Sequence, residues 1–444
     1  MSLKPMSYEC IECLLRHMDA NTRFQISRRC PSLRALEKVT PLKVNKLHFT
    51  SDSVVVNQFK YRLSIYQKYN NGRTPGFVRR NNEIGFIHYE VDRFGIEDES
   101  DRRIVSPGDV EMKWPPREEN IDQDEMVAGI RDEEKIQELQ NEIRALEARM
   151  VEQQGRRPTR RRRSNNREIK DILERERAKL LAHQCRFNNV TPPYEYFLQL
   201  SIKNLVAEDG DQVIERYVHN KKFSEAMRYL STLFFSGRRY PVYVKFLEFT
   251  RREGVVRFPL GIQFKIQSLK FPAAASLTLD GLTSIIHESS YPLKSLDVFI
   301  FSLADAQHMI VQAARALTIK VYSQNEVQIL LNLPNPMIKL VTKQFTFAAG
   351  TLGQLLMNWI TTHQAIGKEV SMEFSMQPWL ADEMEEVRAR YHGQIIDDKN
   401  MIIPMNATAQ IRVTYGEYFS PAALWGLRLR VESILSAQYL NYWN

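Results

Sequence analysis

A strand-like alternation of apolar and polar residues recurs in the C-terminal half of the chain at nearly constant spacing. The four segments cover residues 277–279, 296–298, 317–321 and 338–340, and their first residues are 19, 21 and 21 positions apart. Apolar helical stretches at residues 304–316 and 352–361 lie between or after them. A strand and a helix that alternate about every 20 residues predict a stack of similar units, each covering its neighbour.

This spacing resembles a leucine-rich repeat, in which each unit buries its apolar face against the next. Leu293-x-x-Leu296-x-Val298 has the leucine rhythm of that family in one unit. A non-repetitive α/β domain is the alternative. Further strands are expected at residues 370–374 and 411–415, and an amphipathic helix at residues 223–235. In both cases residues 191–444 are predicted to hold the main core.

An antiparallel β region is predicted before this domain, at residues 51–117. Its strands are expected in three runs of β-branched and aromatic residues, at 54–56, 61–66 and 84–89. Turn sequences separate or follow these runs, and they are Asn70-Asn-Gly72, Thr74-Pro-Gly76 and Ser106-Pro-Gly108. Short strands with such turns between them favour hairpins.

Residues 118–190 are predicted to be a charged insertion, partly helical and partly disordered. Its first helix has apolar residues at the a and d positions of barely two heptads, namely Ile136, Leu139, Ile143, Leu146 and Met150. A second charged helix is expected at residues 167–182. Six arginines between the helices form a candidate nuclear localisation signal or a solvated tract: Arg156, Arg157, Arg160, Arg161, Arg162 and Arg163.

The charge of the chain is segregated into blocks. Residues 97–125 carry 11 acidic and 4 basic side chains, whereas residues 155–170 carry 1 acidic and 8 basic ones. A nucleic-acid-binding protein more often spreads basic charge over a folded face, so nucleic acid is not the expected partner. No apolar run approaches the roughly 18 residues that span a bilayer, and the start lacks the apolar segment of a secretory signal. With only four cysteines, the expected location is the cytoplasm or the nucleus.

The first 50 residues are predicted to form a small helical head. Its apolar residues recur at helical spacing on both sides of a polar turn, as Ile11, Leu14, Leu15 and Met18, then Phe24 and Ile26. This rhythm resembles an F-box. The run Ile26-Ser-Arg-Arg-Cys-Pro-Ser-Leu-Arg34 resembles the opening of a large nematode family of F-box-like proteins. Runs that begin at Tyr61, Ser106 and Asn358 extend the resemblance over most of the chain outside the charged insertion.

The F-box resemblance implies docking on a Skp-type adaptor of a cullin ubiquitin ligase, with an unknown protein substrate held by the C-terminal domain. The residues that it assigns to the adaptor contact are Pro5, Ile11, Leu14, Leu15, Met18, Phe24 and Ile26. Short helices with surplus apolar surface need a partner to cover them, or else the rest of the chain. The alternative is a relic of the F-box that packs only against its own chain.

Motifs of catalysis and cofactor binding are missing from the sequence. His287-Glu-Ser-Ser-Tyr291 lacks the second histidine of a zinc protease, and there is no nucleophile elbow, dinucleotide fingerprint or phosphate loop. Cys10, Cys13 and His17 share one helical face, with Cys30 beyond, which is a weak zinc pattern. The favoured explanation is that a short helix packs Cys10 and Cys13 as small apolar core residues. We therefore expect no enzyme activity, no cofactor and no metal.

The expected fold class is α+β with several domains: the head at 1–50, the β region at 51–117, the insertion at 118–190 and the α/β repeat-like domain at 191–444. The expected function is that of a non-enzymatic protein-interaction module, as the substrate receptor of a cullin-type ubiquitin ligase. The alternative is a scaffold that self-associates through residues 130–154, with the F-box as a structural relic.

Overall fold

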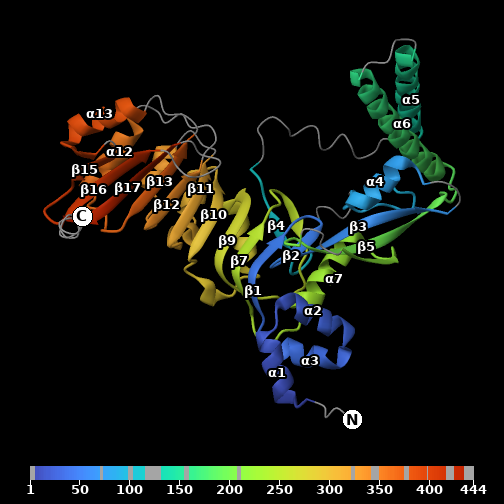
Figure 1. Ribbon diagram of the computed structural model, residues 1–444, viewed down its shortest axis with the longest axis horizontal. Helices are drawn as coiled ribbons and strands as arrows, with labels where there is room; N and C mark the ends of the chain where they lie inside the picture. Colours follow the sequence, from blue (N-terminus) through green and yellow to red (C-terminus); the bar gives the residue numbers. More distant parts are fainter. Residues whose placement is uncertain are drawn as a thin grey trace.

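The computed structural model describes residues 6–70, 74–98, 104–115, 132–154, 160–207, 212–321, 326–341, 350–374, 380–397, 399–416 and 425–434. It is a mixed α/β structure in which fifteen strands of these described ranges join one long sheet. Figure 1 shows the strands in a curved row across the molecule, with the N-terminal helices below its middle and a helical hairpin above one end.

Seven neighbouring strands in the middle of the sheet run parallel. Six of them follow one another along the chain, while the first comes from the N-terminal region and pairs with β7. In sheet order they are β1 (Lys43–Phe49), β7 (Val242–Phe249), β9 (Phe264–Ala274), β10 (Ser295–Ile300), β11 (Ala316–Val321), β12 (Met337–Val341) and β13 (Glu369–Phe374).

Antiparallel strands extend this parallel centre on both sides. Beyond β13 follow β17 (Trp425–Ser433), β16 (Ala409–Gly416), β15 (Asn400–Pro404) and β14 (Gln394–Asp397). Beyond β1 follow β2 (Ser53–Val56), β3 (Phe59–Tyr69), β5 (Tyr194–Asn204) and β6 (Val213–Val218). A separate two-stranded sheet pairs β4 (Val110–Met112) with β8 (Gly254–Val256).

One residue in two along the parallel strands is buried in a continuous apolar core. In register across the sheet these residues are Leu47, Leu247, Leu269, Leu296, Leu317, Ile338 and Val370. Helices that connect the strands bury their apolar residues, such as Leu282 and Leu355, in the same core. These helices are α8 (Ala275–Thr283), the 3₁₀ turn η1 (Glu288–Ser290), α9 (Leu303–Gln307), α10 (Met309–Ala313), α11 (Glu326–Leu331), α12 (Thr351–Thr361) and α13 (Leu380–Tyr391).

The spacing of 21 residues that the sequence predicts appears directly in the strand register. Leu296 lies opposite Leu317, and Leu317 lies opposite Ile338, so two successive units each return the chain to the same height in the sheet. The predicted strands at 296–298, 317–321, 338–340, 370–374 and 411–415 all lie within strands of the structure. The helix predicted at 223–235 is α7 (Phe223–Phe235).

Two of the predicted strands are wrong. Residues 277–279 lie in helix α8, where Leu279 and Leu282, three positions apart, are buried on one helix face and Leu277 is exposed. Residues 84–89 continue from the end of helix α4 (Gly76–Ile84) into a segment without strand pairing. Ile87 and Tyr89 of that segment still pack against the core, which explains their apolar pattern.

Three short helices form the N-terminal head: α1 (Tyr8–His17), α2 (Ala20–Arg29) and α3 (Pro31–Val39). Ser7 caps α1, because its side chain accepts a hydrogen bond from the backbone N–H of Cys10. The side chain of Asp19 caps α2 by accepting a hydrogen bond from the backbone N–H of Asn21. Pro31 occupies the first turn of α3, where a missing N–H costs nothing. Two capping residues and one proline therefore fix where the three helices begin.

The charged insertion forms a helical hairpin from α5 (Asp132–Gln154) and α6 (Arg160–Phe187). The hairpin stands away from the sheet in Figure 1. No helix among the described residues is long and apolar enough to cross a membrane. The division into four domains remains a prediction; in the structure, strands from residues 1–50, 51–117 and 191–444 all lie in one sheet.

Candidate protein-docking surface

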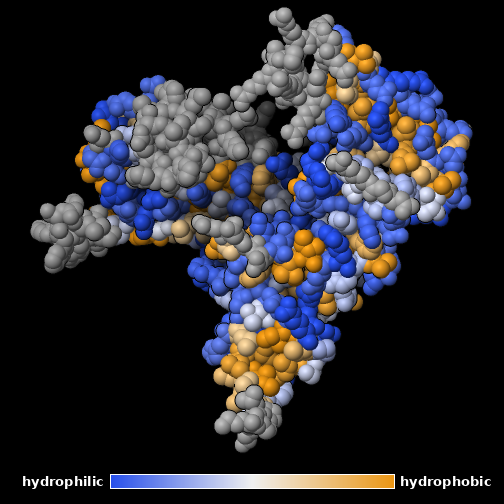
Figure 2. Space-filling model, turned by 45° about the vertical axis from the view of Figure 1, so that its right-hand side comes forward, coloured by the Kyte–Doolittle hydropathy of each residue, from blue (hydrophilic) through white to orange (hydrophobic). Residues whose placement is uncertain are grey.

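The helical head carries an exposed apolar surface at the N-terminal end of the molecule. Four large apolar side chains of the head are exposed, with fractions from 38% to 58%: Met6, Tyr8, Leu14 and Val39. We call these four residues the apolar head surface. Figure 2 shows orange, apolar residues gathered on the lower projection of the molecule. Exposed apolar groups that gather on one projecting unit are typical of a protein interaction site.

The residues that the F-box resemblance assigns to an adaptor are divided between this surface and the interior. Leu14 is exposed, and Ile11, Met18 and Ile26 are half-buried. Leu15 and Phe24 are only 1% and 2% exposed, so in this conformation no partner can reach them. Pro5 lies outside the described residues. The structure thus leaves four of the seven residues at the surface of the head.

Phe24 is buried because α2 packs on helix α7 of the α/β domain. Its ring stacks on Phe234 with centroids 4.4 Å apart and meets Phe235 edge to face at 5.9 Å. Tyr61 of β3 closes the cluster against Phe234 at 4.7 Å. Aromatic clusters of this kind bury a large area, so the head is held firmly on the domain.

A buried ion cluster forms the second attachment of the head. Glu37 of α3, whose side chain is fully buried, binds Arg23 of α2 at 3.0 Å and Arg238, just after α7, at 2.9 Å. Arg23 also donates to the backbone carbonyls of Pro41 and Thr40. Almost all donors of the buried charges therefore have acceptors, which is the condition for tolerating ions in a protein interior.

Lys38 of α3 makes the third attachment. Its Nζ donates to the backbone carbonyls of Leu233 and Phe234 at the end of α7, at 2.9 and 3.3 Å. These carbonyls belong to the last turn of a helix, where no helical N–H can satisfy them. Burial, followed by the neighbouring positive charge of Arg238, lowers the pKa of Lys38 to about 8.

The candidate nuclear signal is only partly within the described residues. Arg156 and Arg157 lie outside them, and the backbone of Arg160 to Arg163 forms the first turn of helix α6. The nearby heptad residues Leu139 and Ile143 are buried, and so are Ile169 and Leu173 of α6. The apolar stripe proposed for self-association therefore packs against α6 of the same chain.

The zinc pattern of the head is dispersed over the surface. Cys10 and Cys13 are exposed on α1, and Cys30 is exposed between α2 and α3. Within the part of the chain that the structure describes, no group of three or more His, Cys, Asp or Glu residues is placed to hold a metal ion.

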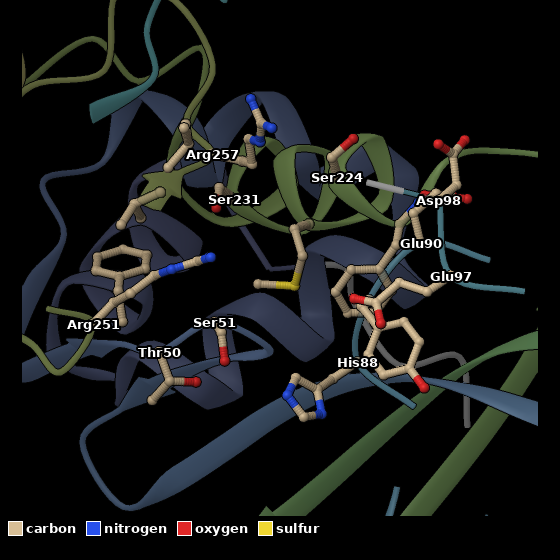
Figure 3. A pocket seen from close by; sticks show the side chains of 16 residues that line it. Thr50, Ser51, His88, Glu90, Glu97, Asp98, Ser224, Ser231, Arg251 and Arg257 are labelled. Atoms are coloured by element: carbon tan, nitrogen blue, oxygen red, sulfur yellow. The ribbon is translucent and has the colours of Figure 1, made fainter. Parts of the chain in front are cut away.

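A cleft that sequence reasoning missed lies at the carboxyl ends of β1 and β7. It has a volume of about 330 Å³, and its lining comes from the β1–β2 turn, residues 88–98, helix α7 and residues 251–257. Figure 3 shows Arg251 and Arg257 on one side and Glu90, Glu97 and Asp98 on the other. Clefts at the carboxyl ends of parallel strands are frequent ligand sites.

Several charged groups of this cleft hold loops in place. Glu90 accepts a hydrogen bond from the backbone N–H of Phe223 at the start of α7. Arg257 and Arg228 both bind the fully buried carboxylate of Asp109, at 2.9 and 2.8 Å. Asp109 lies in the Ser106-Pro-Gly-Asp turn, which was the only sequence signal for this site. These hydrogen bonds and ion pairs hold the loops around the cleft together.

These features define a mixed α/β fold with a helical head that exposes four large apolar side chains. A family description, "domain of unknown function (DUF3557)", matches residues 222–376, which include helix α7 and strands β7 to β13. No curated protein and no solved structure matches the chain.

Proposed function

We propose that the protein is a non-enzymatic substrate receptor whose helical head docks on a Skp-type adaptor of a cullin ubiquitin ligase. The apolar head surface is the observation behind this proposal. Its exposed side chains keep apolar area in contact with water, which is unfavourable, and a helical partner with an apolar face would bury that area. The resemblance of the head to an F-box of the nematode family supports the same partner.

The α/β domain would then hold the substrate. The 21-residue register of β10, β11 and β12, with a connecting helix after each strand, supports the resemblance to a leucine-rich repeat. Repeat sheets offer a broad face for protein partners. Such a receptor would act in the cytoplasm or the nucleus, where the arginines at 160–163 would serve as a targeting signal.

The experiment is size-exclusion chromatography of the full chain with a purified nematode Skp-type adaptor. Leu14→Asp places a charge on the apolar head surface and should abolish co-elution, while the fold is kept because Leu14 is not part of the core. Met309→Asp is the matched control, since Met309 is 77% exposed on α10 and far along the chain from the head. Leu15 is unsuitable for this test because its burial would make Leu15→Asp a folding variant.

Co-elution of the wild type and of Met309→Asp, together with its loss in Leu14→Asp, is the expected result. Failure of the wild type to bind would leave the head as a relic that packs on its own chain. Equal binding by Leu14→Asp would show that the adaptor uses another surface.

A further inference from the structure

The central sheet has a second face, opposite the apolar core that the described connecting helices share. The residues that alternate with the buried apolar row point to this face, which we call the open face. Strand register aligns them in two rows across nine strands. The first row is Lys46, Phe246, Ser268, Ser295, Ala316, Met337, Glu369, Arg430 and Arg412. The second row is His48, Glu248, Lys270, Asp297, Thr318, Lys339, Ser371, Arg428 and Thr414.

Positive charge dominates these two rows. They hold six lysines and arginines but only three carboxylates, Glu248, Asp297 and Glu369. Two of the carboxylates, Glu248 and Glu369, are moreover recessed. Glu248 is 10% exposed between Lys46 and Lys270, which are 49% and 38% exposed and bind it at 3.0 and 3.1 Å.

The same arrangement recurs further along the sheet. Glu369 is 19% exposed, whereas Arg428, which lies 3.4 Å from it, is 46% exposed. Arg430 stands directly opposite Glu369 in the register and is exposed. Because the cations project beyond the acids that they bind, solvent meets a positively charged face.

Small side chains leave room above the middle of the open face. Ser268, Ser295, Ala316, Thr318 and Ser371 occupy its centre, between the cations of β9 and those of β12 and β17. The hydroxyl of Ser295 donates to that of Ser268 at 2.7 Å, so this part of the face is polar. A chain lying across the strands would thus be flanked by Lys270 at one end and by Lys339 and Arg428 at the other.

We propose that the open face binds an acidic, extended segment of a partner protein, which on the proposed function is the substrate to be marked. Charge complementarity identifies the occupant. The recessed acids interrupt the positive rows, so the face fits carboxylates spaced along a polypeptide better than the unbroken charge of a phosphate backbone. Binding is electrostatic and weakens with salt.

The test measures binding of a fluorescent peptide of alternating Glu and Ser to the full chain by anisotropy. A length of about 12 residues matches the width of nine strands, at about 3.3 Å per residue against about 4.8 Å per strand. The variant Lys339→Glu with Arg430→Glu reverses one half-buried and one exposed charge of the face and should weaken binding about tenfold at low salt. Arg144→Glu with Arg149→Glu on α5 makes the same change in net charge outside the face and should bind as the wild type does.

Three outcomes would overturn this inference. The first is no binding of the peptide by the wild type, and the second is equal weakening in both double variants, which would reveal a general charge effect. The third is tighter binding of a single-stranded oligonucleotide of equal charge, sensitive to the same two residues. The assay contains no adaptor, so its failure leaves adaptor docking untouched, and failure of adaptor docking leaves this result standing. Thermal unfolding of each variant checks that it is folded.

Discussion

The ring of Phe24 in helix α2 stacks on the ring of Phe234 in helix α7, with their centroids 4.4 Å apart and their planes 17° from parallel. The whole charged insertion and strands β1 to β6 lie between the two residues along the chain. Their contact joins the head to the α/β domain, so part of the helical head is also part of the main core.

Replacing Phe24 by Ala should therefore destabilise the whole protein and not the head alone. The expected loss is about 3–5 kcal/mol in the free energy of unfolding, as for other buried phenylalanines. Urea unfolding followed by circular dichroism should show one transition at lower urea concentration. Leu14→Ala, on the exposed side of the head, should change the free energy by less than about 1 kcal/mol.

Two separate transitions in the wild type would contradict this expectation. The head would then unfold on its own, and the boundary predicted near residue 50 would be a true domain boundary. A single transition shared by head and domain would instead favour a head that is built into the fold.

The repeat period and the longest helices could be predicted from the sequence because local pattern determines them. Helix α7 begins and ends where the amphipathic pattern predicts, and Leu317 and Ile338 recur with the register of their strands. Residues 277–279 show the limit of that reasoning. Their three side chains fit a strand or a helix, and only the packing of Leu282 one turn later decides.

The partners of each element could not be predicted, because they depend on contacts between distant residues. Nothing in the pattern of β1 indicates that Leu47 pairs beside Leu247, or that β1 completes the parallel sheet. The same holds for Phe24, whose apolar character fits an adaptor contact as well as a contact with α7. The cleft was missed for the same reason, since its lining comes from four separate segments.

Glu37→Gln should be among the most damaging substitutions in the head. It removes the carboxylate that binds both Arg23 and Arg238 in the buried cluster and leaves the two buried guanidinium groups with neutral acceptors such as the Thr40 and Phe234 carbonyls. Loss of one partner of a buried ion pair costs about 3–5 kcal/mol. Chemical denaturation measures the loss. Glu12→Gln, which removes an exposed pair with Arg16, is the control and should cost less than about 1 kcal/mol. Similar values for both would mean that the cluster contributes no more than a surface pair.

Lys368 should make stability depend on pH in the alkaline range. Its Nζ is buried and donates to the carbonyls of Leu333 and Asn335, at 2.8 and 2.6 Å, and burial lowers its pKa to about 8 from 10.5. Between these two values the unfolded chain binds a proton that the folded chain has lost, so stability rises with pH. Below about pH 8 Lys368 is charged in the folded chain as well, and the folded state then bears the full free-energy cost of burying that charge.

The comparison of the wild type with Lys368→Met isolates this effect. The difference in free energy of unfolding between the two should shift in favour of the wild type as the pH rises from about 7 to about 10.5. Urea titrations at both pH values measure the difference. A constant difference would show that Lys368 titrates with the same pKa in the folded and unfolded chains. Lys339→Met, on the open face of the sheet, is the lysine control.

The helical hairpin should be removable without loss of the fold or a change in oligomeric state. Asp132 at the start of α5 accepts hydrogen bonds from Arg186 near the end of α6, at 2.5 and 2.8 Å, so the two ends of the hairpin lie side by side. Replacing residues 136–182 by a short Gly-Ser linker keeps this base and removes the apolar stripe that includes Leu139. Because that stripe is buried against α6, light scattering after chromatography should give a monomer for the full chain and for the shortened one. An oligomer that is lost with the hairpin would instead favour the self-associating scaffold over the receptor.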